Sequence, residues 1–115
     1  MGPSRFFEVN FMGTATLTNP HQISAGGDLK IIKATLTMSN SYAAGGGDTL
    51  NVLTTAGIHL NTVDSILINP HPFANLTYSP STDLVLAFRP IASPEEVDNG
   101  TDLSEVPVSC LIFGR

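Results

Sequence analysis

Cysteine is nearly absent from this sequence, since Cys110 is the only one in 115 residues. A single cysteine excludes an intrachain disulfide and a zinc site made of several cysteines. The small domain must therefore be held by its core or by assembly with other chains, and we expect it to fold in a reducing compartment. Cys110 itself lies in an apolar run near the end of the sequence, which predicts a buried, structural side chain.

Charge is also scarce. Charged residues make up 13% of the chain, about half of the ~25% in an average globular domain. Five Lys and Arg against ten Asp and Glu give a net charge of −5. A negative net charge does not suit a protein that must neutralise the phosphates of nucleic acid, so we expect no binding to nucleic acid. Because half of the carboxylates lie within residues 95–105, the rest of the surface is predicted to be weakly charged and suited to contact with other protein.

Long hydrophobic runs are missing as well. No run approaches the ~18 apolar residues of a membrane-spanning helix, and residues 1–8 lack the apolar region of a signal peptide. We therefore expect no membrane contact and no secretion by a recognisable signal. The length suits one domain over residues 1–115, with residues 1–11 as an N-terminal arm or first strand.

What the sequence does contain is a series of short segments rich in Thr, Val, Ile and Phe, separated by Gly, Pro, Asn and Asp. This pattern is typical of an all-β domain. In residues 30–38, alternation places Ile32, Ala34, Leu36 and Met38 on one buried face. With little or no helix, a single antiparallel β-sandwich of jelly-roll type fits best. About eight strands are predicted, at residues 6–11, 14–18, 29–39, 49–53, 65–68, 74–78, 84–89 and 106–113.

Two short patterns occur twice in the sequence. Ala-Thr-Leu-Thr stands at residues 15–18 and 34–37, and a Gly-rich segment ending in Leu stands at 24–29 and 43–50. The repeats indicate either a duplicated hairpin or a chance similarity between two β-hairpins. Pro107, near the start of the last predicted strand, lacks a backbone N–H and would suit an edge strand.

Residues that could carry chemistry do not form a recognised set. The three His lack the spacing of a metal site on one helix face. Residues 98–102 lack the Glu of a calcium loop, and the Gly-rich residues 44–48 lack the Lys and helix of a phosphate-binding loop. No nucleophile motif occurs, and Glu95 and Glu96 are predicted to lie on a solvated face. We therefore expect no enzymatic activity, no metal and no cofactor.

Two stretches resemble a known family. Residues 41–50, Ser-Tyr-Ala-Ala-Gly-Gly-Gly-Asp-Thr-Leu, are similar to a Ser-Tyr-x-x-Gly-Gly-Asp-x-Leu element of small structural proteins in tailed bacteriophages, with one extra Gly. Residues 96–115 are similar to the closing Glu-Val-x-x-Gly-Thr-Asp-Leu-Ser element of those proteins, followed by an apolar strand and Gly. The resemblance is to capsid decoration proteins, also called cement proteins.

The resemblance implies a β-sandwich that is made in the host cytoplasm and assembles in the virion, as a homotrimer, on the outer capsid surface. Its partners would be the major capsid protein and other copies of itself. Our hypothesis for the contact residues, between subunits or with the capsid, is the set Arg5, Phe6, Phe7, Phe11 and Tyr42. Phe7 and Phe11 could instead belong to the core face of the first strand.

A second hypothesis comes from a different class of protein. The same sandwich scaffold could serve as a tail-associated adhesion or carbohydrate-binding module of a phage, because a fold does not fix a function. Sugar sites usually display exposed aromatic platforms, and this chain has no Trp and only two Tyr.

Overall fold

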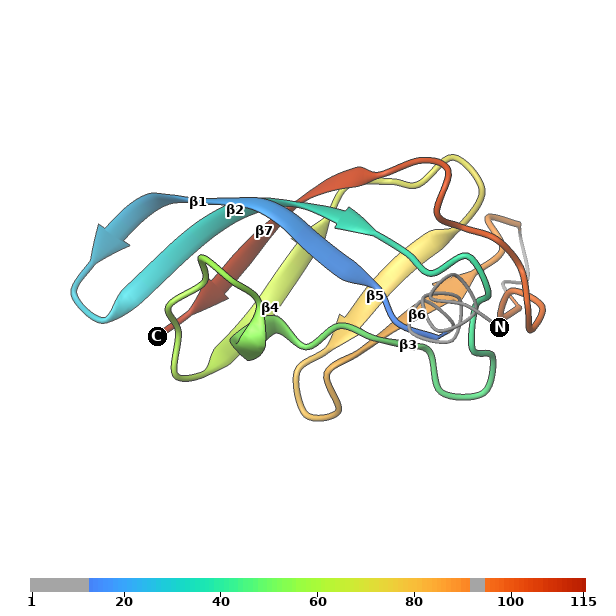
Figure 1. Cartoon of the computed structure of the whole chain (residues 1–115), viewed down its shortest axis with the longest axis horizontal. Helices are drawn as coiled ribbons and strands as arrows, with labels where there is room; N and C mark the ends of the chain where they lie inside the picture. The colour runs from blue at the N-terminus through green and yellow to red at the C-terminus, as the bar shows by residue number, and fades with distance from the viewer. Residues whose placement is uncertain (1–12, 92–94) are drawn as a thin grey trace, which may run out of the picture.

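The computed structural model describes residues 13–91 and 95–115, which fold into two antiparallel sheets packed as a sandwich (Figure 1). One sheet has the order β1-β2-β7-β4 and the other the order β3-β6-β5. The all-β sandwich predicted from the sequence is therefore confirmed. The strands described are β1 Thr16–Gly26, β2 Leu29–Thr37, β3 Asp48–Thr49, β4 Val63–Ile68, β5 Asn75–Ser79, β6 Leu84–Phe88 and β7 Val108–Gly114.

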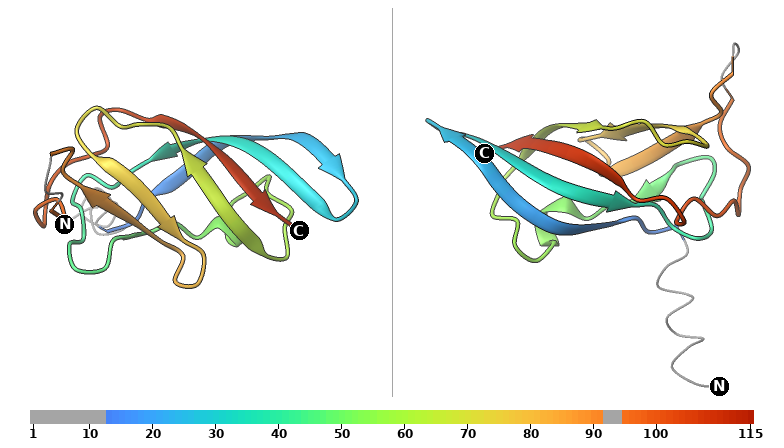
Figure 2. Two further views of the ribbon diagram at one scale, coloured as in Figure 1. Left: turned by 180° about the vertical axis from the view of Figure 1, so that it is seen from behind. Right: turned by 90° about the horizontal axis from the view of Figure 1, so that it is seen from above.

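The core lies between the two sheets and follows the period-2 pattern of the strands. The β2 side chains Ile32, Ala34 and Leu36, with Met38 just beyond the strand, are all buried, as the alternation predicts. In β7 the buried positions are Val108, Cys110, Ile112 and Gly114, so the side chains between them point to the outer face of the sheet. The turned views in Figure 2 show the sheets as two layers.

The two sheets are joined along one side by a short parallel bridge between Thr14 and Thr49. The Ala15 N–H donates to the Thr49 carbonyl at 2.8 Å, and the Thr49 N–H donates to the Gly13 carbonyl at 2.9 Å. On the other side β4 lies next to β5 (Figure 2). These two connections close the sandwich around its core.

Strand β1 is longer than the sequence predicts, since it continues through Pro20 to Gly26 instead of ending at residue 18. The pairing with β2 shifts register between Thr18 and His21, and Asn19 has a positive φ of 53°. Pro20 therefore stands inside a bulge, where its missing N–H costs no regular ladder bond. No strand among the described residues pairs with the other edge of β1, so proline is tolerated there.

The predicted strand at residues 49–53 is shorter than expected. Only Asp48–Thr49 pair as β3, because Asn51 adopts a left-handed conformation with φ of 56° and turns the chain into a 3-10 helix, η1, at Val52–Thr54. This one turn agrees with the sequence, which predicts at most a single helical turn in the connection at residues 53–60. The predicted strand at residues 6–11 lies outside the described residues.

The internal repeats do not form a duplicated hairpin. The two Ala-Thr-Leu-Thr segments pair with each other, since Leu17 lies opposite Leu36 in the β1–β2 hairpin. The Gly-rich segment at 24–29 spans the turn of that hairpin, whereas residues 43–50 include the connection from one sheet to the other. Pro107 also differs from expectation, because β7 pairs with strands on both sides and Pro107 stands just before it.

Cys110 is 2% exposed and points into the core, which confirms the structural role predicted from the sequence. Burial raises the pKa of the Cys110 thiol to about 11. We therefore expect a neutral alkylating reagent to label Cys110 very slowly in the folded protein and at the rate of a free cysteine in denaturant, because the thiolate is the reactive form. Mass spectrometry over a time course measures both rates, and rapid labelling of the native protein would contradict the buried position.

Candidate interaction surfaces

The loop at residues 39–48 is organised around the carboxylate of Asp48. The side chain of Asp48 is 0% exposed, and it accepts hydrogen bonds from the Ser39 N–H at 2.9 Å and the Ala43 N–H at 3.1 Å. The Gly47 N–H closes the loop by donating to the Ala43 carbonyl at 2.8 Å. Because an unpaired buried N–H is costly, one carboxylate fixes the shape of the whole Gly-rich loop.

This loop is bonded to residues 96–103, which are about fifty positions away in the sequence. The Tyr42 N–H donates to the Thr101 carbonyl at 2.9 Å, and the Gly100 N–H donates to the Tyr42 carbonyl at 2.8 Å. The Ala44 N–H donates to the Asn99 side chain at 3.0 Å. We call residues 39–48 together with 96–103 the loop junction. It forms one end of the sandwich.

Tyr42 occupies the centre of the loop junction and is 0% exposed. Its hydroxyl donates to a Glu96 carboxylate oxygen at 2.7 Å and accepts from the Ala87 N–H of β6 at 2.9 Å. This position corrects the predicted surface contact at Tyr42, because its side chain is enclosed within its own chain. Of the two residues predicted on a solvated face, Glu95 is exposed, whereas Glu96 is half-buried and its carboxylate accepts from both the Tyr42 hydroxyl and the Gly45 N–H.

The two tyrosines of the chain should resist ionisation. Burial raises the pKa of Tyr42 and of Tyr78 above the ordinary value of 10.0, and the carboxylates of Glu96 and Asp83 that accept their hydroxyl protons raise it further. The unfolded chain therefore releases these protons at lower pH than the folded protein, so stability should fall as pH rises above about 10. We expect phenolate absorbance to appear together with alkaline unfolding followed by circular dichroism. Phenolate that forms at pH 10 in the folded protein would contradict this.

His71 holds the β4–β5 connection against the loop junction. Its imidazole is buried, with Nε2 3.2 Å from the Leu103 carbonyl, while Nδ1 accepts from the Phe73 N–H at 3.1 Å. Because Nδ1 is the acceptor, the geometry assigns the proton to Nε2, which donates to Leu103. The His71 and Phe73 rings lie 5.7 Å apart in a tilted arrangement. His71 therefore fixes the backbone from which Phe73 projects.

Phe73 is 61% exposed and borders a depression that we call the end patch. Arg89 and Asp98 form an ion pair there at 2.8 Å, with both side chains partly in solvent. Asp102 is exposed, and hydrogen bonds from the Ser104 hydroxyl and N–H hold the pKa of its carboxyl below the ordinary value, so it is ionised at neutral pH. The end patch is lined by Phe73, Arg89, Val97, Asp98, Thr101, Asp102 and Leu103.

A second depression, the sheet patch, lies on the outer face of the four-stranded sheet. Leu67 of β4, Leu111 of β7 and Lys33 of β2 stand in one row across the strands. Leu67 is 62% exposed, and Lys33 is exposed beside it. The depression is lined by Lys33, Leu67, Asn69, Ser109, Cys110 and Leu111. Lys33 is the one charged residue of this set.

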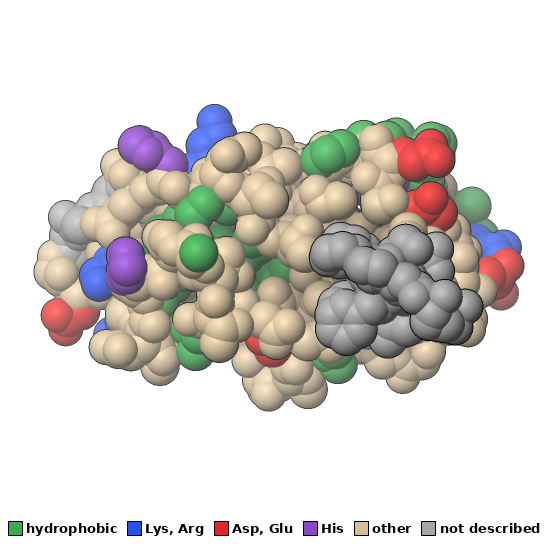
Figure 3. Space-filling model, in the orientation of Figure 1, with side chains coloured by type: hydrophobic (Ala, Val, Ile, Leu, Met, Phe, Trp, Pro, Cys, Tyr) green, Lys and Arg blue, Asp and Glu red, His purple; other side chains and the backbone are tan. Residues whose placement is uncertain are grey.

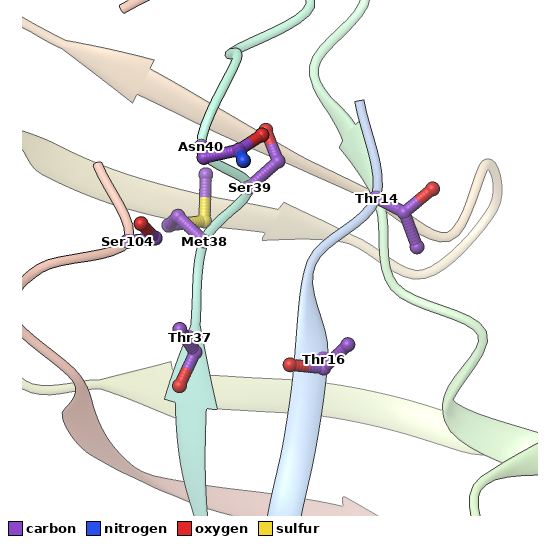
Figure 4. Close-up of a pocket in the computed structure, with 7 residues that line it drawn as sticks. All are labelled: Thr14, Thr16, Thr37, Met38, Ser39, Asn40 and Ser104. Atoms are coloured by element: carbon purple, nitrogen blue, oxygen red, sulfur yellow. The ribbon is translucent and has the colours of Figure 1, made fainter. Parts of the chain in front are cut away.

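A third depression offers only neutral groups. Its lining comes from Thr14 and Thr16 on one side, residues 37–40 on the other, and Ser104 (Figure 4). The Ser39 hydroxyl oxygen is buried without a hydrogen-bond partner in the part of the chain that the structure describes. Hydroxyls and an amide can bind polar groups here, but no side chain of the lining titrates near neutral pH.

The predicted contact residues Arg5, Phe6, Phe7 and Phe11 lie outside the described residues. Within residues 13–91 and 95–115, no group of three or more His, Cys, Asp or Glu is placed to hold a metal ion. In the same ranges, none of the helical structure is long and apolar enough to span a membrane. Much of the face in Figure 3 is neither charged nor hydrophobic, in agreement with the sparse charge of the chain.

Sequence reasoning missed Leu67 and Phe73, although each left a signal. In the strand predicted at residues 65–68, the alternation that packs Ile66 and Ile68 partly buried against the core turns Leu67 outward, as the structure shows. Phe73 follows two prolines in a turn-rich segment, where an aromatic side chain has no strand face to occupy.

Comparisons of this chain with protein-family models, with curated proteins and with solved structures found no match.

Proposed function

We propose that this protein is a capsid decoration protein of a tailed bacteriophage, which binds the outer capsid surface as a homotrimer and stabilises the capsid. The observation that carries the proposal is the loop junction. The Gly-rich stretch at 41–50 and the stretch that begins at residue 96 carry the resemblance to the family, and they are hydrogen-bonded to each other. The resemblance therefore covers one three-dimensional unit, which is harder to obtain by chance than two separate turns.

The proposed mechanism is avidity. Three linked copies engage three equivalent sites on the major capsid protein, so modest contacts at each site sum to tight binding without any chemistry. The weakly charged surface suits this role, because the centres of protein interfaces are depleted in charged residues. Arg5, Phe6, Phe7 and Phe11 stay our choice for the contact between subunits or with the capsid. We also propose that residues 6–11 add a strand and that the sandwich is of jelly-roll type.

The direct test mixes purified protein with empty capsids of the same phage and separates bound from free protein by sedimentation. We expect saturable binding in multiples of three copies and capsids that withstand a higher temperature. Deletion of residues 1–7 should weaken capsid binding or trimer formation, while circular dichroism verifies that the fold is kept. Absence of binding by the full chain would refute the function, and an unchanged result for the deletion would refute the role of the arm.

The carbohydrate-binding hypothesis gains one observation from the structure. Phe73 supplies an exposed aromatic ring beside the polar groups of Arg89 and Asp98, and such a ring can stack on the apolar face of a sugar. An array of bacterial surface glycans tests this second function, with Phe73→Ala as the variant that should lose binding. Glycan binding by the chain without binding to capsids would favour it over capsid decoration.

A further inference from the structure

We propose that the end patch of one copy of this chain binds the sheet patch of a second copy. The contact would be heterologous, since two different surfaces meet, and its repetition would close a ring of copies. This inference rests on the proposed trimer, to which it adds the surfaces in contact. The occupant of each patch is therefore another copy of the same protein.

Exposure singles out the two side chains at the centres of these patches. Among the large hydrophobic residues whose burial is described, Leu67 at 62% and Phe73 at 61% are the most exposed. Neither side chain is needed to cover the core, and both lie at depressions lined by polar and apolar groups. Exposed apolar side chains that are rimmed by polar groups are typical of protein contact sites.

The two patches also fit in shape. Phe73 projects from a backbone that His71 fixes through the Phe73 N–H, so the ring is presented in a defined position. The sheet patch is a depression of about 390 Å³ whose lining includes Leu67 and Leu111. A cavity of about 150 Å³ is already sufficient for benzene, so the sheet patch has room for a phenyl ring.

Charge favours the pairing of unlike patches over the pairing of like patches. Lys33 is the one charged residue lining the sheet patch, and it makes no ion pair with the residues that the structure describes. The end patch has one Arg against the two carboxylates of Asp98 and Asp102. A symmetric contact of two sheet patches would place one Lys33 near another, whereas the unlike contact places Lys33 near a carboxylate.

The two patches lie at different places on the molecule. Leu67 lies on the outer face of the sheet, while Phe73 lies only six residues further along the chain, near the loop junction at the end of the sandwich. A heterologous contact closes into a ring when the rotation between successive copies adds up to a full turn, and otherwise continues as an open filament. The proposed trimer requires the closed form.

The test uses one variant for each patch, Leu67→Asp and Phe73→Asp, and Leu53→Asp as the matched control. Leu53 is another exposed leucine, located in η1 and outside both patches. Analytical ultracentrifugation of the wild type should show a closed oligomer. Each patch variant should weaken association by about tenfold or more, as for a central interface residue, while Leu53→Asp should behave as the wild type. Circular dichroism verifies that all three are folded.

Mixing the two patch variants decides between a heterologous and a symmetric contact. Leu67→Asp retains an intact end patch and Phe73→Asp an intact sheet patch, so an equimolar mixture should form a heterodimer that grows no further. Failure to form this heterodimer would overturn the inference, as would a wild type that is monomeric. Lys33→Glu provides a second test, with Lys30→Glu as its control on the same strand, and only Lys33→Glu should weaken association.

Capsid sedimentation separates this inference from the proposed function. A monomeric wild type that still binds capsids would overturn the contact between copies and the homotrimer, and would leave capsid binding itself standing. A ring that forms as described but does not bind capsids would support the contact between copies and refute the decoration function.

Discussion

Replacement of Asp48 by Ala should lower the free energy of unfolding by about 2 to 5 kcal/mol. The carboxylate of Asp48 is buried and accepts hydrogen bonds from the backbone N–H groups of Ser39 and Ala43. Alanine would leave both donors without a partner in a place that excludes water. The measurement is denaturant unfolding followed by circular dichroism, with the midpoint and slope compared with those of the wild type.

Asp102→Ala is the matched control for this prediction. Asp102 also accepts two hydrogen bonds, from the N–H and the hydroxyl of Ser104, but it is exposed. Water can replace the lost acceptor there, so its substitution should cost less than about 1 kcal/mol. Equal destabilisation by Asp48→Ala and Asp102→Ala would show that burial of the Asp48 carboxylate is not what organises the loop.

Among replacements of a glycine by alanine in the loop junction, Gly47→Ala should lower the stability of the protein most. Gly47 has a φ of 99°, which residues with a side chain rarely adopt, and a Cβ there would lie 2.6 Å from the Val85 carbonyl oxygen. That oxygen belongs to the backbone of β6, in the sheet that also contains β3, and cannot move without disturbing the pairing. We expect a loss of about 3 kcal/mol or more, measured as above.

Gly45→Ala separates backbone strain from the steric clash. Gly45 lies in the same loop with a φ of 88°, and a Cβ there would meet no atom within 4 Å. Its N–H bond to Glu96 would remain, so only the conformational cost of about 1 to 2 kcal/mol applies. A Gly47→Ala variant no less stable than Gly45→Ala would contradict the close approach of the loop to β6.

The sequence predicts the strands well where burial follows a simple period. Ile32, Ala34 and Leu36 alternate with polar residues, and the same alternation sets which face of β2 is buried. The strand predicted at residues 14–18 ends too early because proline usually breaks a strand, whereas the edge position of β1 and its bulge accommodate Pro20. Whether a strand lies at the edge or in the centre of a sheet depends on the assembled sheet, and the sequence of a short segment does not encode it.

The location of Tyr42 could not be predicted for a related reason. A tyrosine beside a Gly-rich turn resembles a surface residue when only its neighbours in sequence are considered. Its burial depends on Glu96 and on the Ala87 N–H, which are 54 and 45 positions away. Together they satisfy the hydroxyl, and without such partners a buried tyrosine oxygen would be costly. Phe73 lies in a turn, where strand alternation gives no guide to burial, and the backbone from which it projects is held by the distant contact of His71 with Leu103.

The irregular edge of β1 has a consequence for the protein at high concentration. A straight strand of 11 residues at the edge of a sheet would offer a template to which a strand of another molecule could add, the first step of aggregation. In β1 the register shifts twice, and Pro20 removes a donor near the middle. An incoming strand could therefore match only a few residues before losing register. We expect the native protein to stay soluble when concentrated, and substitutions that straighten β1 to promote fibrils.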